Sequence, residues 1–373
     1  MTDERLPGLY VHVPFCRSKC FYCDFYSITA ASLIPAWLSA VLTEARLYKE
    51  RFGIFDSLYI GGGTPTVLDT AQLELLINGL LSEFHFLPDT EVTIEANPDC
   101  ITREKLDLLR ELGVNRISLG VQSFDDDHLS FLGRQHTASE AELALENIRT
   151  AGITNLGVDL IYGSKDLSEE KWVKTLEKAL TFKPEHLSCY QLTLEKGTRF
   201  GKMKDEGLIK PISEEDARRF FIVTSLFLRE NGYVHYEISN FALNESYYSR
   251  HNQKYWRHVP YLGLGPSAHS FKAGVRWWND RSVKSYCTRL DRGELPIEGE
   301  ERLSEEQLSL EAVYLGLRTK EGLDIADIDD HPRLGPIINQ LLGTGLIEMV
   351  DGRITPTVEG FLVADHLPLL FAD

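Results

Sequence analysis

Residues 10–25 read YVHVPFCRSKCFYCDF and place three cysteines, Cys16, Cys20 and Cys23, within one short stretch. The apolar run at 9–15, which has a proline near its end, predicts a buried strand that stops just before the first cysteine. The cysteines therefore leave a strand end in a loop. Because functional sites of parallel α/β folds lie at the carboxyl ends of their strands, this stretch predicts such a fold with its site at the cysteines.

The spacing of the three cysteines indicates an iron–sulfur cluster. Three thiolates hold three irons of a four-iron cluster and leave the fourth iron open to another ligand. A structural zinc site normally uses four closed ligands, and no second Cys-x-x-Cys or His-x-x-x-His follows in the sequence. Disulfides are the other alternative, but the cluster has an odd number of cysteines and nothing indicates an oxidising compartment. We therefore expect a [4Fe-4S] cluster, with zinc as the minor alternative.

Composition and charge narrow the class of protein. A chain of 373 residues buries a large core, and its length suggests two or three domains unless one α/β barrel takes most of it. The 39 basic and 56 acidic side chains give a formal charge of −17, which argues against nucleic acid as a partner. The charged N-terminus does not read as a signal peptide, and no apolar stretch reaches the ~18 residues of a membrane span. We expect a cytoplasmic protein without a transmembrane segment.

Strand and helix patterns alternate along the first two thirds of the chain. Runs typical of strands lie at 9–15, 57–63, 91–98, 116–123, 156–162 and 186–192, and helical patterns lie at 32–52, 102–112, 138–151, 169–180 and 214–230. This alternation indicates βαβ units, and right-handed crossovers make their sheet parallel. We predict a partial (β/α)6 barrel. A dinucleotide-binding fold would need Gly-x-Gly-x-x-Gly after a strand, and the glycines at 61–63 do not have that spacing.

The last third of the chain has a different pattern. Residues 243–303 are rich in aromatic residues and glycine and are too irregular for βα units, so we describe them as a connecting segment. Residues 304–373 begin with a capping box of Ser304 and Gln307 and end with a predicted hairpin around Asp351 and Gly352. These patterns predict a small helical, winged-helix-like domain. Its wing, which is the hairpin, is acidic and therefore suits the phosphates of DNA poorly. The predicted domains are 1–242 (the core), 243–303 and 304–373.

Polar residues at the ends of predicted strands are the next candidates for function. The glycines of GGGTP at 61–65 let a backbone approach a ligand, although a tight turn explains them as well. Glu95, Gln122 and Asp159 lie in or just after apolar strands, and Arg134 follows in a loop. Because a buried charge is costly unless it is paired, such residues are either functional or part of a structural ion-pair layer.

The Cys-x-x-x-Cys-x-x-Cys stretch resembles the signature of the radical S-adenosylmethionine (SAM) superfamily, with Tyr22 as the aromatic residue before the third cysteine. This resemblance implies that the amine and carboxylate of SAM chelate the open iron and that an electron from the cluster cleaves the sulfonium. It also implies that Gly62, Gly63 and Thr64 hold the methionyl amine and that Tyr22 is one of the cofactor-binding residues.

Six ordered motifs resemble the oxygen-independent coproporphyrinogen III oxidase family over nearly the whole chain. They are YVHVPFC at 10–16, GGGTP at 61–65, IEANP at 94–98, GVQSF at 120–124, LGRQH at 132–136 and VDLIYG at 158–163. The resemblance implies that Glu95 and Arg134 contact the methionyl end of SAM and that Gln122 and Asp159 contact its ribose. The full set of SAM contacts that it implies is Tyr10, Gly62, Gly63, Thr64, Glu95, Gln122, Arg134 and Asp159.

Two departures point to one branch of this family. The oxidases carry a fourth cysteine where this chain has Phe25, and they have a longer N-terminal extension. The segment HNQKYW at 251–256 is similar to the His-Asn-x-x-Tyr-Trp motif of the HemW branch, whose members bind heme and pass it to respiratory hemoproteins. Imidazole is a normal axial ligand of heme iron, so His251 is the predicted heme ligand, with Tyr255 and Trp256 able to pack on the porphyrin.

The resemblance therefore implies a radical SAM protein that binds a [4Fe-4S] cluster, SAM and heme and acts as a heme chaperone. The alternative is an enzyme that oxidatively decarboxylates coproporphyrinogen III, and a zinc-binding module is a distant third. A lone histidine among aromatic residues is often only a hydrogen-bonded packing residue, and that interpretation of His251 stays open from sequence.

Overall fold

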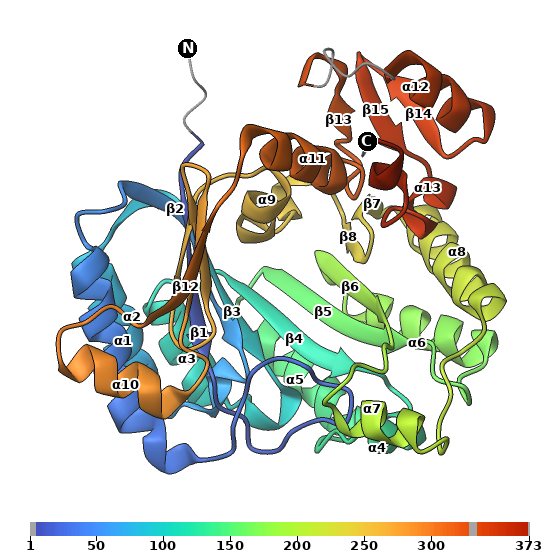
Figure 1. Cartoon of the computed structure of the whole chain (residues 1–373). Coiled ribbons are helices and arrows are strands. Elements are labelled where there is room, and N and C mark those ends of the chain that lie inside the picture. The colour runs from blue at the N-terminus through green and yellow to red at the C-terminus, as the bar shows by residue number, and fades with distance from the viewer. Residues whose placement is uncertain (1–4, 328–333, 372–373) are drawn as a thin grey trace.

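The computed structural model describes residues 5–327 and 334–371, and its main feature is a twelve-stranded sheet curved into an open barrel (Figure 1). Six neighbouring strands are parallel and follow one another in chain order, which confirms the predicted partial barrel. They are β1 (Gly8–Val13), β2 (Ile54–Gly62), β3 (His85–Ala96), β4 (Arg116–Gln122), β5 (Asn155–Tyr162) and β6 (His186–Gln191).

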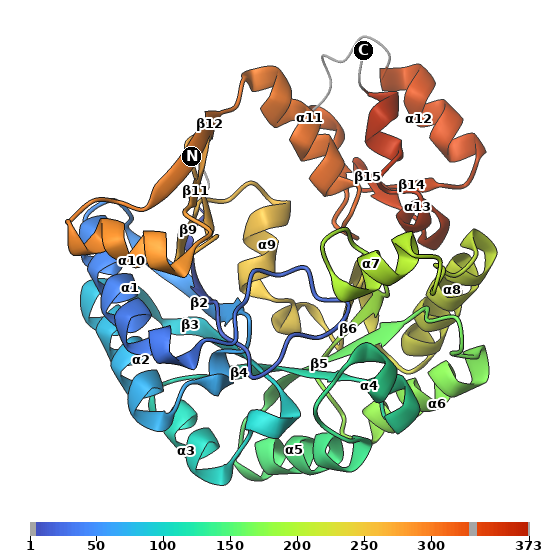
Figure 2. The ribbon, with the colours of Figure 1, turned by 60° about the horizontal axis from the view of Figure 1, so that its bottom comes forward.

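The convex face of the parallel strands is apolar, and helices cover it. In β4, for example, Ile117, Leu119 and Val121 are all fully buried. Successive side chains of a strand point to opposite faces, so the residues between them point into the barrel. The covering helices are α1 (Ile34–Tyr48), α2 (Thr70–Glu83), α3 (Arg103–Glu111), α5 (Ala138–Thr150), α6 (Glu169–Thr181) and α8 (Glu214–Glu230) (Figure 2).

The inward face of the same strands is polar or small. Strand register places Glu95 of β3 beside Ser118 of β4, and Ser118 beside Gly157 of β5. Gly157 is in turn paired with His186 of β6. Each strand thus gives apolar side chains to the core and polar ones to the interior of the barrel, an alternation that suits a ligand-binding interior better than a packed one.

Residues 243–303 do more than connect two domains. They form β9 (Tyr261–Leu264), β10 (His269–Lys272), β11 (Val275–Asn279) and β12 (Ile297–Arg302), with α9 (Arg250–Trp256) before and α10 (Val283–Asp291) among them. β9 pairs in parallel with the free side of β1, and the other three continue the sheet. The sequence did not predict these strands because they are short and their aromatic residues follow no clear period. On the other side, β8 (Asn240–Ala242) and β7 (Val234–Glu237) extend the sheet from β6.

A buried carboxylate ties this added segment to the barrel. Glu44 of α1 is fully buried and accepts hydrogen bonds from the Tyr286 hydroxyl (2.6 Å), the Gly265 amide (2.9 Å) and the Asn279 side chain (2.7 Å). Burial raises the pKa of Glu44 to about 7 although these hydrogen bonds favour its charged form. One side chain of the first helix therefore holds three points of the segment that completes the sheet.

The C-terminal residues form a small unit with its own hydrophobic core, at the upper right of Figure 1. Its elements are α11 (Glu305–Gly316), α12 (Leu334–Gly343), α13 (Val358–Leu362) and the antiparallel strands β13 (Leu323–Asp324), β15 (Arg353–Pro356) and β14 (Ile347–Val350). The predicted capping box and hairpin are both present, and Asp351 and Gly352 have the positive φ angles (49° and 79°) of a tight hairpin turn. Along residues 5–327 and 334–371, no helix has the length and apolar character needed to cross a membrane.

Candidate functional site

The cysteine loop follows β1 and runs across the open end of the barrel, where the parallel strands have their carboxyl ends (Figure 2). The Cys16 amide donates to the carbonyl of Ile28 (3.0 Å), which closes the base of the loop. At its tip, the Phe21 amide donates to the Leu132 carbonyl (3.2 Å), and the Phe21 carbonyl accepts from the Phe200 amide (2.9 Å). The loop is thus closed on itself at its base, and its tip is fixed to the helices α4 (Asp126–Leu132) and α7 (Arg199–Asp205).

The three cysteines of this loop are free and half-buried, and neighbouring groups donate hydrogen bonds to two of their sulfurs. The Thr64 hydroxyl lies 3.5 Å from Sγ of Cys16, and the Arg134 guanidinium lies 3.4 Å from Sγ of Cys20. In the part of the chain that the structure describes, no three His, Cys, Asp or Glu side chains gather around the position of a single metal ion. Three thiols are the donor set of an iron–sulfur cluster, which spreads its thiolate ligands over several irons, whereas a structural zinc site closes four ligands around one ion.

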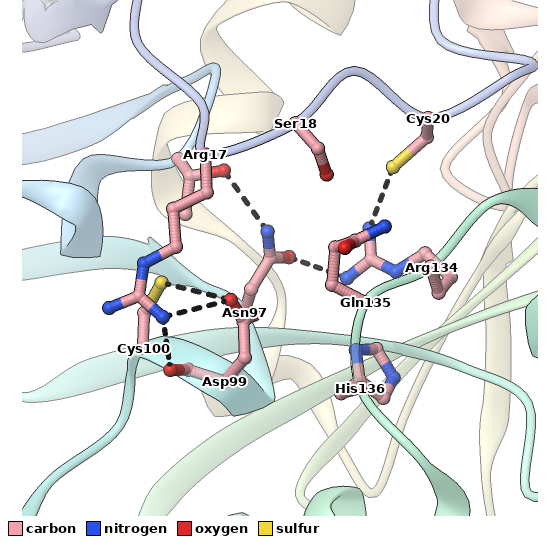
Figure 3. A pocket seen from close by; sticks show the side chains of 10 residues that line it. Arg17, Ser18, Cys20, Asn97, Asp99, Cys100, Arg134, Gln135 and His136 are labelled. Carbon is pink, nitrogen blue, oxygen red and sulfur yellow. Dashed lines mark hydrogen bonds and ion pairs between the residues drawn. The ribbon is translucent and has the colours of Figure 1, made fainter. Parts of the chain in front are cut away.

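A hydrogen-bonded network joins the two donors, and Figure 3 shows its part around Asn97, Arg134 and Cys20. Asn97 donates to the Thr64 hydroxyl (3.0 Å) and accepts from Arg134 (2.6 Å), which also donates to the Gly120 carbonyl (2.8 Å). Thr64, Asn97 and Arg134 line a small hollow beside Cys20. Asn97 was not among the predicted site residues, although a polar side chain between a strand and a proline was a usable signal.

Arg134 reaches this network because α4 ends directly before it. The helix stops at Gly133, whose φ of 76° is left-handed. A Cβ atom there would lie 2.7 Å from the ring of Phe21, so glycine is required both by the backbone and by the aromatic side chain of the cysteine loop. Tyr22 is the neighbour of Phe21, and burial raises its pKa well above the ordinary value although Arg134 opposes this.

Protein atoms occupy the space beside the two glycines at the end of β2. A Cβ atom on Gly62, whose φ is 108°, would lie 2.6 Å from the ring of His12, and one on Gly63 would lie 2.6 Å from the carbonyl oxygen of Phe15. The Gly63 amide also donates to the Val13 carbonyl (2.8 Å). Close approach of His12 of β1 and of Phe15 at the start of the cysteine loop therefore explains both glycines without a ligand, and their contact with SAM stays a prediction.

The predicted carboxylates both lie on the inward face. Glu95 accepts from the Tyr59 hydroxyl (2.8 Å) and the Gly62 amide (3.0 Å), and burial raises its pKa to about 7. Asp159 accepts from the Ser118 hydroxyl (3.1 Å), and burial raises its pKa as well. The hydrogen bonds of Glu95 and Asp159 named here come from neutral groups, and the positive charges of Arg116 and Arg134 also act on Asp159, where they oppose the rise of its pKa. A functional role and a structural role both stay predictions at these two positions.

Gln122 and Tyr10 complete the set of predicted SAM contacts. Gln122 has a φ of 65° and lies at a β-bulge between β4 and β5, which turns its side chain toward Gly120 and the Arg134 network. Tyr10 donates to Nδ1 of His12 (3.0 Å) on the inward face of β1. The structure thus brings Cys16, Cys20, Thr64, Gln122 and Arg134 together at the loop, with Glu95 joined through Gly62 and with Tyr10 and Asp159 deeper in the barrel.

His251 lies at the opposite end of the barrel. Its Nδ1 is hydrogen-bonded to the Ser57 hydroxyl (3.3 Å) and its Nε2 to the Tyr255 hydroxyl (2.8 Å), and the side chain is 1% exposed. Ser57 pairs with Gly8 at the start of β1, five residues before its end, so His251 is roughly 16 Å along the strand from the cysteine loop. In this state His251 is a hydrogen-bonded packing residue, the interpretation that the sequence left open.

Two other imidazoles of the same segment are more accessible. His269 is exposed and stacks on Trp278 with ring centroids 5.9 Å apart. His258 is partly exposed and hydrogen-bonded to Glu311 (3.1 Å). Both imidazoles are less buried than that of His251, although neither belongs to the 251–256 motif.

Comparison with known proteins gives a consistent picture. A family model described as the radical SAM superfamily matches residues 10–179. The chain is 35% identical to a heme chaperone HemW of Synechocystis over 89% of this chain and 81% of that protein, and 33% identical to a heme chaperone HemW of Lactococcus lactis over 98% and 97%. The solved structure of coproporphyrinogen III oxidase (HemN) from Escherichia coli, described as a radical SAM enzyme, superposes with a TM-score of 0.85 at 26% identity, over 99% of this chain and 90% of that one.

Proposed function

The chain belongs to the HemW family of heme chaperones within the radical SAM superfamily, and on this basis we propose that it binds heme and transfers it to a recipient hemoprotein. Its other cofactors are a [4Fe-4S] cluster and SAM, as membership of the superfamily implies. The observation that carries the cofactor assignment is the pair of hydrogen bonds from Thr64 and Arg134 to the sulfurs of Cys16 and Cys20.

The residues of the loop suit a cluster. Cys16, Cys20 and Cys23 would hold it, and the hydroxyl of Thr64 and guanidinium of Arg134 would donate to its sulfur ligands, an arrangement that tunes cluster potentials. When bound, the cluster supplies an electron to SAM in this superfamily. The backbone hydrogen bonds of Phe21 to α4 and α7 hold the loop over the opening and limit the access of water from that side.

The heme ligand of this proposal follows from the motif at 251–256. Ligation through Nε2 of His251 requires that the Tyr255 hydroxyl move away, because it lies 2.8 Å from that nitrogen and occupies the position that the iron would take. His251 in a rearranged state is therefore the proposed ligand, and His258 and His269 are the less buried alternatives.

A second candidate function is oxidative decarboxylation of coproporphyrinogen III, favoured by the likeness to the solved oxidase. Position 25, where the oxidases carry their fourth cysteine, holds a phenylalanine that is 70% exposed. We therefore expect reconstituted protein, reductant, SAM and coproporphyrinogen III to give no protoporphyrinogen IX under anaerobic conditions.

The deciding experiment runs the anaerobic coproporphyrinogen III assay in parallel with a heme-transfer assay. Protein loaded with heme is mixed with an apo-hemoprotein such as apomyoglobin, and the absorbance spectrum of the acceptor reports transfer. A chaperone gives transfer without porphyrinogen turnover. Turnover of the porphyrinogen would restore the oxidase, and heme that stays unbound at micromolar protein would remove the chaperone proposal.

A further inference from the structure

A lysine is buried behind the turn that carries Thr64. Lys105 belongs to α3, one of the helices that cover the outside of the barrel (Figure 2), and its side chain lies inward at 9% exposure. Its Nζ donates a hydrogen bond to the carbonyl oxygen of Thr66 (2.6 Å). Because lysine is almost never buried this deeply unless an opposite charge is paired with it, the position of this ammonium calls for a physical reason.

No carboxylate of the described residues forms an ion pair with Lys105. Burial lowers the pKa of its ammonium, and the positive charge of Arg17 adds to this effect. Cys100, Asp69 and Asp99 oppose it, the two carboxylates from beyond ion-pair distance. Asp99 is itself paired with Arg17 (3.2 Å), so its charge is largely engaged. A buried charge is costly until an anion lies near it, and these residues supply little of that anion.

The turn that Lys105 holds is the one that meets the cysteine loop. It consists of η2 (Pro65–Val67), which begins directly after Thr64. The Thr64 hydroxyl lies 3.5 Å from Sγ of Cys16, and Lys105 holds Thr66 two residues farther on. Since two residues span at most ~7 Å, the ammonium is on the order of 10 Å from the sulfur.

A cluster on the three cysteines supplies the anion that Lys105 lacks. The charges of three thiolates exceed the positive charge of the oxidised iron–sulfide core, and the excess grows when the core accepts an electron. Arg134 already supplies one cation, beside Cys20. Lys105 adds a second one, which approaches from behind the Thr64 turn.

We propose that Lys105 is a positioning residue of the cluster site, which holds the Thr64 turn against Cys16 and whose positive charge favours the reduced cluster. This inference rests on the cluster assigned above. Salt screens a buried charge much less than an exposed one, so a buried ammonium acts on the cluster at this distance.

The test is a redox titration of reconstituted protein, followed by the electron paramagnetic resonance of the reduced cluster. Lys105→Met removes the charge and the hydrogen bond. Lys105→Gln removes the charge but keeps an N–H donor for the Thr66 carbonyl, so it preserves the turn even if Lys105→Met does not fold. Both variants should show a lower potential, by about the 59 mV of a tenfold change in the ratio of reduced to oxidised cluster. That is the effect of a unit charge ~10 Å away at an effective dielectric constant of ~20. Lys105→Arg keeps the charge and should stay close to wild type.

Arg103→Gln is the matched control. Arg103 lies two residues earlier on the same helix, but it is exposed and paired with Asp107 (2.9 Å). The control removes an equal charge on the solvent side, where salt screens it, so its potential should equal that of wild type. A wild-type potential in Lys105→Gln would overturn the inference. An equal fall in Arg103→Gln would overturn it too, because net charge alone would then explain both variants.

Iron and sulfide are measured before each titration. If Lys105→Gln keeps the wild-type melting temperature but loses the cluster, the charge is needed to hold the cluster, which supports the inference. Wild-type protein without iron and sulfide would instead remove the cluster assignment itself, and the failure of that assignment is thereby distinguished from a failure of the role of Lys105.

Discussion

Replacing Tyr255 with phenylalanine should strengthen heme binding if His251 is the heme ligand. The Tyr255 hydroxyl lies 2.8 Å from Nε2 of a histidine that is 1% exposed, so an incoming iron has to displace this hydrogen bond. A net hydrogen bond contributes about 0.5–1.5 kcal/mol, and 1.4 kcal/mol is a factor of ten in affinity. Tyr255→Phe should therefore tighten heme binding by roughly twofold to tenfold.

The assay is a hemin titration followed by absorbance, with Tyr261→Phe as the control. The ring of Tyr261 lies against that of Tyr255, with centroids 4.7 Å apart, but its hydroxyl makes no hydrogen bond to His251. The control should keep wild-type affinity. Unchanged or weaker binding in Tyr255→Phe would refute ligation through Nε2, and His258→Ala and His269→Ala would then identify the imidazole.

Three further outcomes follow from the site and the fold. Changing any one of Cys16, Cys20 and Cys23 to alanine should remove most iron and sulfide after anaerobic reconstitution, and one zinc per chain without sulfide would contradict the cluster. Thr64→Val removes the hydrogen bond to Cys16, so the reduction potential of the cluster should fall in a redox titration, since such bonds stabilise the reduced form. Glu44 has a pKa of about 7 in the folded protein against 4.5 unfolded, so its contribution is fully present below pH 4.5 and is lost as pH rises through about 7. The free energy of unfolding of wild type, measured with urea, should therefore fall between pH 4.5 and about pH 7 by on the order of 3 kcal/mol more than that of Glu44→Gln. Parallel pH profiles of the two proteins would contradict this.

Local patterns predicted much of this molecule. The six parallel strands have long apolar runs at a regular spacing, and the Ser304 capping box and the Asp351–Gly352 turn depend on neighbours in sequence. Such features are visible in a short window of residues. The grouping of Cys16, Cys20, Thr64 and Arg134 came from motifs, and the structure adds the hydrogen bonds that join them.

Features that depend on distant residues were not predicted. His251 is buried because Ser57, 194 positions earlier in the chain, lies against it, and no local pattern carries that information. β9 is a strand because the free side of β1 needs a partner, rather than because its four residues have a strong strand pattern. The sequence shows that Arg116 and Ser118 alternate with apolar neighbours. It does not show which face of the strand the helices cover, and therefore does not show that these two residues face the interior of the barrel.

The pairing of β1 with β9 has a consequence for synthesis of the protein. Val11 is joined to Leu264, so the strand that precedes the cysteine loop keeps an open edge until about 250 more residues have left the ribosome. At ~5–20 residues per second this takes roughly 12–50 s, during which an unpaired apolar edge is open to aggregation. The Phe21 anchor needs Phe200 as well. The cysteines are thus among the first residues to emerge and among the last to reach their final positions, so iron and sulfide should be inserted after translation rather than during it.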